Sequence, residues 1–156
     1  MSISIRNILC PVDFSENSEH ALKYAVALAK AYNANLHLLH VVHPPMMSVP
    51  GDPMVPEFSS DVLQSIATAA KERLNVLAAD IKATVPNVTA QTATGIDFLE
   101  IITAARTQDI DIIVIGTHGR TGLAHVMIGS VAEKIVRKAP CPVLTVKHPE
   151  HEFVMP

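Results

Sequence analysis

Apolar runs and amphipathic stretches alternate along this chain from about residue 5 to residue 147. Runs of four to eight aliphatic or β-branched residues between turn signals indicate buried strands. Apolar residues spaced three and four positions apart indicate helices, because that spacing places them on one helix face. The pattern predicts strands at residues 5–12, 36–42, 88–94, 111–115 and 142–147, and helices over about 16–32, 59–85, 97–107 and 130–138.

The helix starts carry candidate capping residues. Ser15 is suited to capping the first helix and Asp97 the third. Ser130 and Glu133 have the Ser-x-x-Glu spacing of a capping box at the fourth, which would occupy the Ser130 hydroxyl. The apolar spacing predicts the inward faces: Ala21, Leu22, Ala25, Leu28, Ala29 and Tyr32; Leu63, Ile66, Ala67, Ala70, Leu74, Leu77, Ala78 and Ile81; Phe98, Leu99, Ile102 and Ala105.

Strands joined by helices predict one open, parallel sheet. Parallel neighbours need a long crossover connection, and such crossovers are right-handed. Residues 111–115 form the most continuous apolar run, so this strand should be buried on both faces. Residues 88–94 are polar and β-branched, which is typical of a strand at or near an edge. The sequence therefore predicts an α/β fold with helices on both faces of the sheet.

Residues 44–56 interrupt this alternation with five prolines and three methionines. Proline removes a backbone donor and fixes φ, so regular structure cannot continue through the segment, and we predict a long loop. Met46, Met47 and Met54 are adaptable apolar side chains that would suit a lid over a ligand or a partner surface. A loop with neither role explains the composition equally well.

Length and composition limit the classes of protein to consider. The 156 residues fit one domain, with a core over about residues 3–147 and a C-terminal tail at 148–156. The net charge of −3 gives no electrostatic footprint for nucleic acid or an anionic membrane, and we expect neither as a partner. The chain contains no signal-peptide pattern and no span of about 20 apolar residues, so we expect a cytoplasmic protein. The mean hydropathy of +0.29 points to a buried subunit interface.

The cysteines and clustered histidines do not indicate a metal site. Cys10 and Cys141 are one pair without further ligands nearby, and a reduced state is the simpler expectation. His37, His40 and His43 look like a ligand cluster, but alternation along a strand points His40 away from the other two. The sequence predicts no protein-made metal centre here.

A loop with glycines follows the predicted strand at 111–115. The spacing is Gly116-x2-Gly119-x9-Gly129-Ser130, which differs from both the P-loop and the dinucleotide-binding fingerprints. Glycines permit positive φ and a close approach to a ligand. The loop leaves the carboxyl end of a parallel strand, where open α/β sheets bind ligands, and Gly129-Ser130 opens a helix whose N–H groups favour phosphate. These features predict a site for the phosphates of a nucleotide.

Two motifs, in order and correctly spaced, carry a family resemblance. The first is residues 8–15, Ile-Leu-Cys-Pro-Val-Asp-Phe-Ser. The second is residues 115–122, Ile-Gly-Thr-His-Gly-Arg-Thr-Gly, with Gly-Ser-Val at 129–131 and Ala-Pro-Cys-Pro-Val at 139–143. Over roughly residues 3–147 the chain resembles the universal stress protein family, in its nucleotide-binding branch. The resemblance implies a Rossmann-like, three-layer α/β/α fold with a five-stranded parallel sheet of order 3-2-1-4-5.

The resemblance also implies a ligand and a set of contacts. ATP, or AMP or ADP, would bind where the first and fourth strands part. ATP sites of the family can also hold a divalent cation among the phosphates, and Mg²⁺ is the usual ion. The implied contacts are Pro11, Val12 and Asp13 on the adenine and ribose side, with the Val42 backbone at the base; Gly116, His118, Gly119 and Arg120 around the ribose and α-phosphate; and Gly129, Ser130 and Val131 at the β- and γ-phosphates. Asp13 has a competing local explanation, because aspartate favours Asx turns. His125 is expected at the surface.

The residues and the family resemblance leave two classes of function. The first is a regulatory protein whose adenine-nucleotide occupancy is read by a partner, and the resemblance implies a homodimer that pairs the last strands, Val143–Val146, antiparallel. The second is a slow ATPase or another nucleotide-processing enzyme. An enzyme needs a positioned base or activated water near the γ-phosphate. Between Gly116 and Lys134 the only acidic residue is Glu133 and there is no lysine, so no base is assigned and the regulatory class is favoured.

Overall fold

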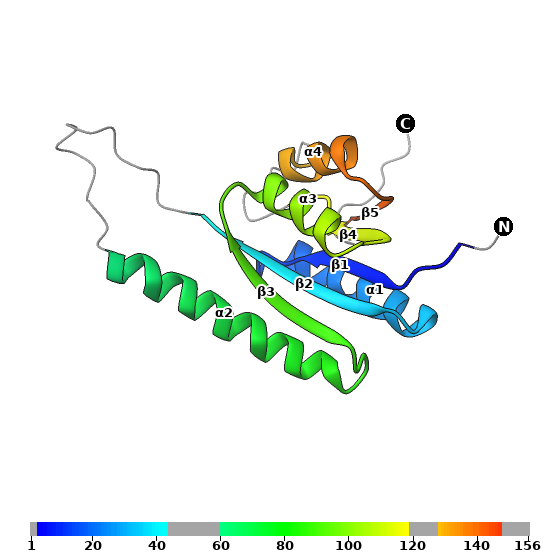
Figure 1. Cartoon of the computed structure of the whole chain (residues 1–156), viewed down its shortest axis with the longest axis horizontal. Coiled ribbons are helices and arrows are strands. Elements are labelled where there is room, and N and C mark those ends of the chain that lie inside the picture. The colour runs from blue at the N-terminus through cyan, green and yellow to red at the C-terminus, as the bar shows by residue number, and fades with distance from the viewer. Residues whose placement is uncertain (1–2, 44–59, 119–127, 148–156) are drawn as a thin grey trace.

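The protein folds as alternating strands and helices, as the hydrophobic pattern predicts. The structure is a computed structural model that describes residues 3–43, 60–118 and 128–147. Gly119, Arg120, His125, the loop at 44–56 and the C-terminal tail at 148–156 lie outside these residues, so the structure does not test the predictions made for them. The elements are β1 (Asn7–Pro11), α1 (Glu16–Tyr32), β2 (Asn35–Val42), α2 (Ser60–Lys82), β3 (Val88–Thr94), α3 (Asp97–Thr107), β4 (Ile112–Gly116), α4 (Ser130–Lys138) and β5 (Val143–Val146) (Figure 1).

The described strands form one parallel sheet. Its order is β3-β2-β1-β4-β5, which confirms the predicted fold class. The polar strand β3 lies at one edge, and the apolar strand β4 lies in the interior between β1 and β5. From β1 the chain continues to β2 on one side, whereas β4 is followed by β5 on the other side. This reversal between β1 and β4 creates the crevice in which open α/β sheets bind ligands.

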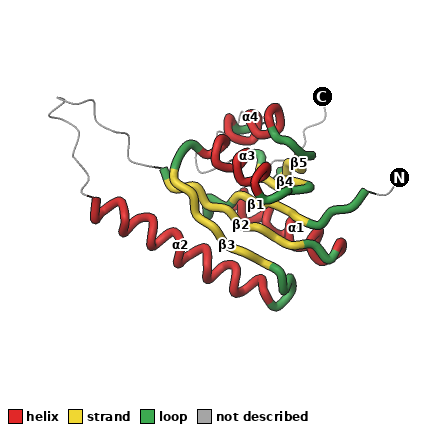
Figure 2. The backbone as a smooth tube through the Cα atoms, viewed as in Figure 1, coloured by secondary structure: helices red, strands yellow, loops and turns green. Residues whose placement is uncertain are grey.

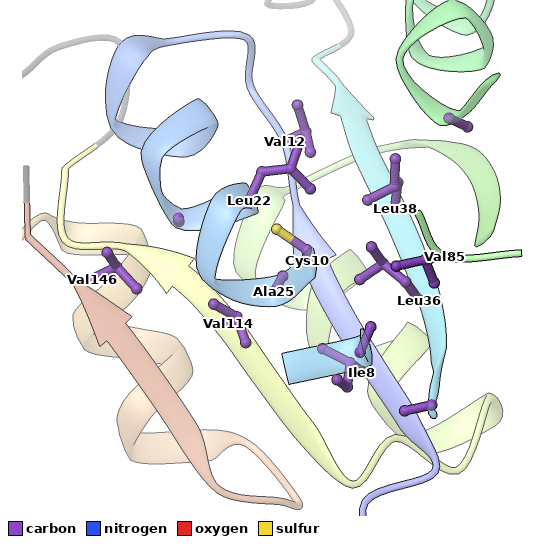
Figure 3. Close-up of a cluster of buried hydrophobic side chains, with 14 of the residues drawn as sticks. Ile8, Cys10, Val12, Leu22, Ala25, Leu36, Leu38, Val85, Val114 and Val146 are labelled. Atoms are coloured by element: carbon purple, nitrogen blue, oxygen red, sulfur yellow. The ribbon is translucent and has the colours of Figure 1, made fainter. Parts of the chain in front are cut away.

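Among the described elements, α1 and α2 cover one face of the sheet and α3 and α4 cover the other (Figures 1 and 2). Successive residues of a strand point to opposite faces, so Ile8 and Cys10 of β1 pack on one side and Leu9 on the other. The first face contacts α1 and α2, and Figure 3 shows its cluster of buried side chains, including Leu22, Leu36 and Val114. The second face contacts α3 and α4, and its cluster includes Leu39, Ile113 and Ile135.

The predicted inward faces are partly wrong at three helices. In α2 only Leu74 and Ala78 are buried, whereas Leu63 is 36% and Ile66 is 47% exposed. The first turns of α2 extend beyond the sheet, which leaves their apolar stripe uncovered by the described part of the chain (Figure 1). In α3 Ile102 and Ala105 are buried as predicted, together with Ile101 and Ala104, but Leu99 is exposed. In α1 Tyr32 is exposed.

Of the three candidate helix caps, only one forms. Ser15 caps α1 as predicted, and its Oγ accepts the Ser18 N–H at 3.3 Å. Asp97 is instead the first residue of α3, after Ile96, which makes no side-chain cap bond. Gly129 is the N-cap of α4 and Ser130 is the first helical residue, so the capping box does not form. The Glu133 carboxylate accepts a hydrogen bond from Arg137 Nε at 3.1 Å instead.

The two cysteines lie on different sides of the sheet. Cys10 and Cys141 are free thiols that pack against opposite faces of the sheet. Burial raises the pKa of Cys10 to about 12, so its thiol stays protonated and inert. Within the described residues, no helix is both long and apolar enough to cross a membrane.

Candidate functional site

A pocket of about 370 Å³ opens at the carboxyl ends of β1, β2 and β4. This volume lies in the range of about 300–1,000 Å³ that is typical of ligand pockets. The pocket occupies the crevice where the chain reverses direction across the sheet. It is lined by Pro11, Val12, Asp13, Ser18, Leu39, His40, Val41, His43, Asp97, Ile101, Ile115, Gly116, Thr117, His118, Gly129, Ser130, Val131 and Ala132.

The wall from β1 is held by hydrogen bonds on both sides. The Val12 N–H donates to the Leu39 carbonyl at 2.8 Å, which fixes the backbone against β2. Asp13 Oδ1 accepts from the Ser15 N–H at 2.9 Å and from the Ser15 hydroxyl at 2.5 Å. The Asx turn weighed as the local explanation for Asp13 is therefore present. The same carboxylate lines the pocket, so the turn orients Asp13 and does not remove it from the site.

The wall from β4 contains Gly116, Thr117 and His118. The Gly116 backbone lies against α1, where an added Cβ would come within 3.0 Å of the Asn17 carbonyl oxygen. His118 is buried, and its Nδ1 lies 3.0 Å from Thr117 Oγ1. Gly129 is explained in the same way as Gly116, because its Cβ would come within 3.0 Å of the Thr117 carbonyl oxygen. Among the described glycines only Gly95 has positive φ, so close backbone packing, not positive φ, favours glycine at these two positions.

The N-terminus of α4 closes a third side of the pocket. The Gly129 N–H donates to the Thr117 carbonyl at 2.6 Å, which ties the start of α4 to the end of β4. No side chain in the described residues caps this helix, whereas Ser15 caps α1. The N–H groups of the first turn have no partner within the helix itself. Ser130, Val131 and Ala132 therefore bring first-turn N–H groups and a partial positive charge to the pocket.

On the fourth side, formed by β2 and α3, the family resemblance implied only the Val42 backbone, and the lining residues His40, His43 and Asp97 were not predicted. His43 follows β2, and its Nε2 donates to Asp97 Oδ2 of α3 at 2.8 Å. His40 is buried, and its Nδ1 donates to the Val12 carbonyl at 2.7 Å. The two histidines face different groups, which agrees with the expected alternation along the strand, and the described residues contain no group of three or more potential metal-binding side chains. Residues 43 and 97 are far apart in sequence, and only the β2–β3 pairing could have indicated their proximity.

Most of the predicted contacts that the structure describes meet in this pocket. Val42 is the exception, because its neighbours line the pocket but it does not, and its carbonyl accepts the Gly95 N–H at 3.1 Å. Gly119 and Arg120 lie outside the described residues. The predicted contacts that line the pocket are Pro11, Val12, Asp13, Gly116, His118, Gly129, Ser130 and Val131.

Comparison with known proteins identifies the family to which this fold and pocket belong. The model of the Universal stress protein family matches residues 4–147. The chain belongs to the universal stress protein family. The universal stress protein YxiE of Bacillus subtilis is 36% identical over 146 residues, covering 90% of this chain and 97% of YxiE. MJ0577 of Methanocaldococcus jannaschii, another universal stress protein, is 31% identical over 158 residues, covering 94% of this chain and 98% of MJ0577.

Solved structures of the family share the fold. The universal stress protein UspA from Lactobacillus plantarum has a TM-score of 0.80 and 30% identity, and the match covers 93% of this chain and 99% of UspA. Two more distant structures are complexes, one with cAMP (TM-score 0.65, 18% identity) and one, from Archaeoglobus fulgidus, with dAMP (TM-score 0.63, 21% identity). At these identities the two complexes establish the shared fold of this chain and nothing finer.

Proposed function

We propose that the chain binds an adenine nucleotide, ATP in the first place, in this pocket and acts as a regulatory protein that responds to its occupancy. The observation that carries the proposal is the convergence of the uncapped α4 N-terminus with the Pro11–Asp13 backbone on one cavity. The first feature favours phosphates and the second offers backbone groups to a base or ribose. Two neighbours of the same fold hold cAMP and dAMP, which supports an adenylate as the ligand.

Phosphates would bind at Gly129–Val131, and the base and ribose would bind toward Pro11–Asp13. Ser130 has a hydroxyl that no helix cap uses, so it suits a phosphate oxygen or a Mg²⁺ ion carried by the phosphates. Mg²⁺ needs few protein ligands when phosphates supply oxygens. Gly119 and Arg120, which the family resemblance also assigns to the ligand, belong to this proposal as further contacts.

We expect bound ATP to be hydrolysed slowly or not at all. Efficient phosphoryl transfer requires a cation clamp and a group that orients the attacking water. None of the described residues that line the pocket is a lysine or an arginine. Backbone N–H groups bind ground-state phosphates about as well as the transition state, and such uniform binding does not raise kcat.

Proline substitutions at the first residues of α4 and α1 test whether the α4 N-terminus binds phosphate. Proline is tolerated at the first helical position, where it removes one N–H without breaking the helix. Ser130→Pro in α4 should weaken ATP binding by tenfold or more, since a hydrogen bond to a charged group contributes about 1.5–3 kcal/mol. Glu16→Pro is the matched control, because both prolines would follow an extended residue, Gly129 with ψ 158° and Ser15 with ψ 159°.

The binding constants should be measured by calorimetry with Mg²⁺ present. Ser130→Ala separates the hydroxyl from the N–H, because it removes only the hydroxyl. Equal affinities for the native protein and Ser130→Pro would place the phosphates elsewhere. Failure of the native protein to bind or to release any adenine nucleotide on denaturation would disprove the proposal.

The enzyme alternative is tested by turnover. His118 is the one described pocket residue near β4 that could carry a proton. A kcat above about 1 s⁻¹, the lower end of typical enzymes, that is lost in His118→Ala would identify an ATPase. Background hydrolysis with retained nucleotide would support the regulatory function.

A further inference from the structure

Phe14 has a backbone conformation that bulky residues rarely adopt. Its φ is 63°, in the left-handed region, and it directly follows the pocket residue Asp13. The other described non-glycine residues with positive φ are Asn33 and Asp109, whose short polar side chains tolerate this region better. A large residue keeps such a conformation only when its surroundings hold it.

The Phe14 ring contacts two side chains from different elements. Arg73 of α2 places its guanidinium carbon 4.2 Å from the centre of the ring. On β2, the His40 ring lies 4.7 Å from the Phe14 ring, tilted by 39°. A guanidinium within about 6 Å of an aromatic face is attracted to it electrostatically. Arg73, Phe14 and His40 therefore form a stack that runs from α2 to β2.

This stack ends at the pocket wall. His40 lines the pocket, and its Nδ1 donates to the Val12 carbonyl at 2.7 Å. The next residue, Asp13, also lines the pocket and is joined to Phe14 by the chain itself. Arg73 does not line the pocket. The backbone of Val12 and Asp13 is thus held at two points by a stack whose outer member belongs to α2.

We propose that Arg73 is a positioning residue for the base and ribose side of the pocket, acting through Phe14 and His40. The inference rests on the proposed nucleotide binding. A ligand that contacts Val12 and Asp13 favours the arrangement that the stack holds, and by thermodynamic linkage it must in turn stabilise Arg73 in α2. Nucleotide occupancy is therefore transmitted to α2, a helix that lies outside the pocket.

Charge-matched variants of α2 test the proposal. Arg73→Met removes the cation and keeps an apolar chain, and it should weaken ATP binding by about two- to fivefold, the size expected for an exposed cation–π contact. Arg73→Lys keeps the cation and should restore most of the affinity. Lys71→Met removes the same charge two positions away, also at an exposed site, and should bind ATP like the native protein, which excludes a general charge effect.

Amide hydrogen exchange supplies the readout that simple packing would not move. ATP should slow exchange around Arg73 in the native protein and in Lys71→Met, but much less in Arg73→Met. If the native protein binds ATP while Arg73→Met keeps native affinity and native protection of α2, the positioning role is wrong and nucleotide binding stands. If the native protein binds no adenine nucleotide, both proposals fall.

Discussion

At the scale of single residues, the two described glycines of the pocket have the same structural role. Gly116 and Gly129 each lie where a Cβ would come within 3.0 Å of a backbone carbonyl oxygen. Such an approach is tighter than ordinary van der Waals contact, and backbone atoms cannot rotate away as a flexible side chain does. Both glycines therefore belong first to the packing of the chain around the site. A variant that loses ligand binding at these positions reports on the fold as well as on the ligand.

Gly116→Ala should destabilise the protein even without nucleotide. The added methyl group would press on the Asn17 carbonyl of α1, and overpacking in a tight core costs about 1–3 kcal/mol. Urea unfolding of the nucleotide-free protein measures the loss. An unchanged free energy of unfolding together with lost ATP binding would show that the space at Gly116 belongs to the ligand.

His37 should make stability depend on pH below neutrality. Burial lowers its pKa below the usual 6.5, because the charged imidazole is poorly solvated beside Thr89 of β3. The unfolded chain then binds more protons than the native protein as the pH falls below about 6.5, so the free energy of unfolding decreases. His37→Gln should lose less stability than the native protein between pH 7.5 and 5.5 in urea titrations. Parallel curves for the two proteins would contradict this.

At the scale of elements, the spacing of apolar residues predicted the bounds of the helices and strands that lie on the sheet. The bounds of α1, β3, α3 and α4 agree with the prediction. The first turns of α2 have the same apolar periodicity but extend beyond the sheet, so spacing alone could not tell that they stay exposed. A capping residue lies just before the first helical residue. Asp97 and Ser130 are themselves the first residues of α3 and α4, so neither side chain caps its helix.

Two alanine substitutions in α2 should differ sharply in cost. Leu74→Ala removes a side chain that is 1% exposed and should lower the free energy of unfolding by about 2–5 kcal/mol. Ile66→Ala, two turns earlier on the same stripe, removes a side chain that is 47% exposed and should change it by about 0.5 kcal/mol or less. Chemical denaturation of both variants tests the difference. A comparable loss at Ile66 would mean that its apolar side chain is covered in solution.

At the scale of the whole molecule, the site is a product of topology. Motifs near residues 11 and 116 could be found in the sequence because each stands at the end of an apolar run. The partners His43 and Asp97 could not, since they meet only through the pairing of β2 with β3 and the turn into α3. The stack of Arg73, Phe14 and His40 likewise joins three elements that are separate in the sequence. Sequence motifs therefore located three sides of the pocket, and the strand pairing brought His43 and Asp97 to the fourth.

The predicted homodimer depends on the outer edge of β5. The Pro142 and Val146 carbonyls accept hydrogen bonds from Ile113 and Thr117, on the β4 side. In a parallel ladder, alternate residues point their backbone groups to one neighbour, so the Thr145 amide points to the open edge. An edge that presents unpaired backbone groups can pair with a second chain. We expect the native protein to form a dimer in which two β5 strands pair antiparallel.

Thr145→Pro should convert that dimer to monomers, because proline removes an outward N–H while an edge strand tolerates it. Thr145→Val keeps the N–H and should remain dimeric. Val146 is unsuitable for this test, since it is 6% exposed within the core cluster and its replacement by lysine would unfold the chain. Sedimentation at micromolar concentration measures the assembly, and circular dichroism confirms that both variants fold. A native protein that sediments as a monomer, or a dimer that survives in Thr145→Pro, would show that β5 is not the interface.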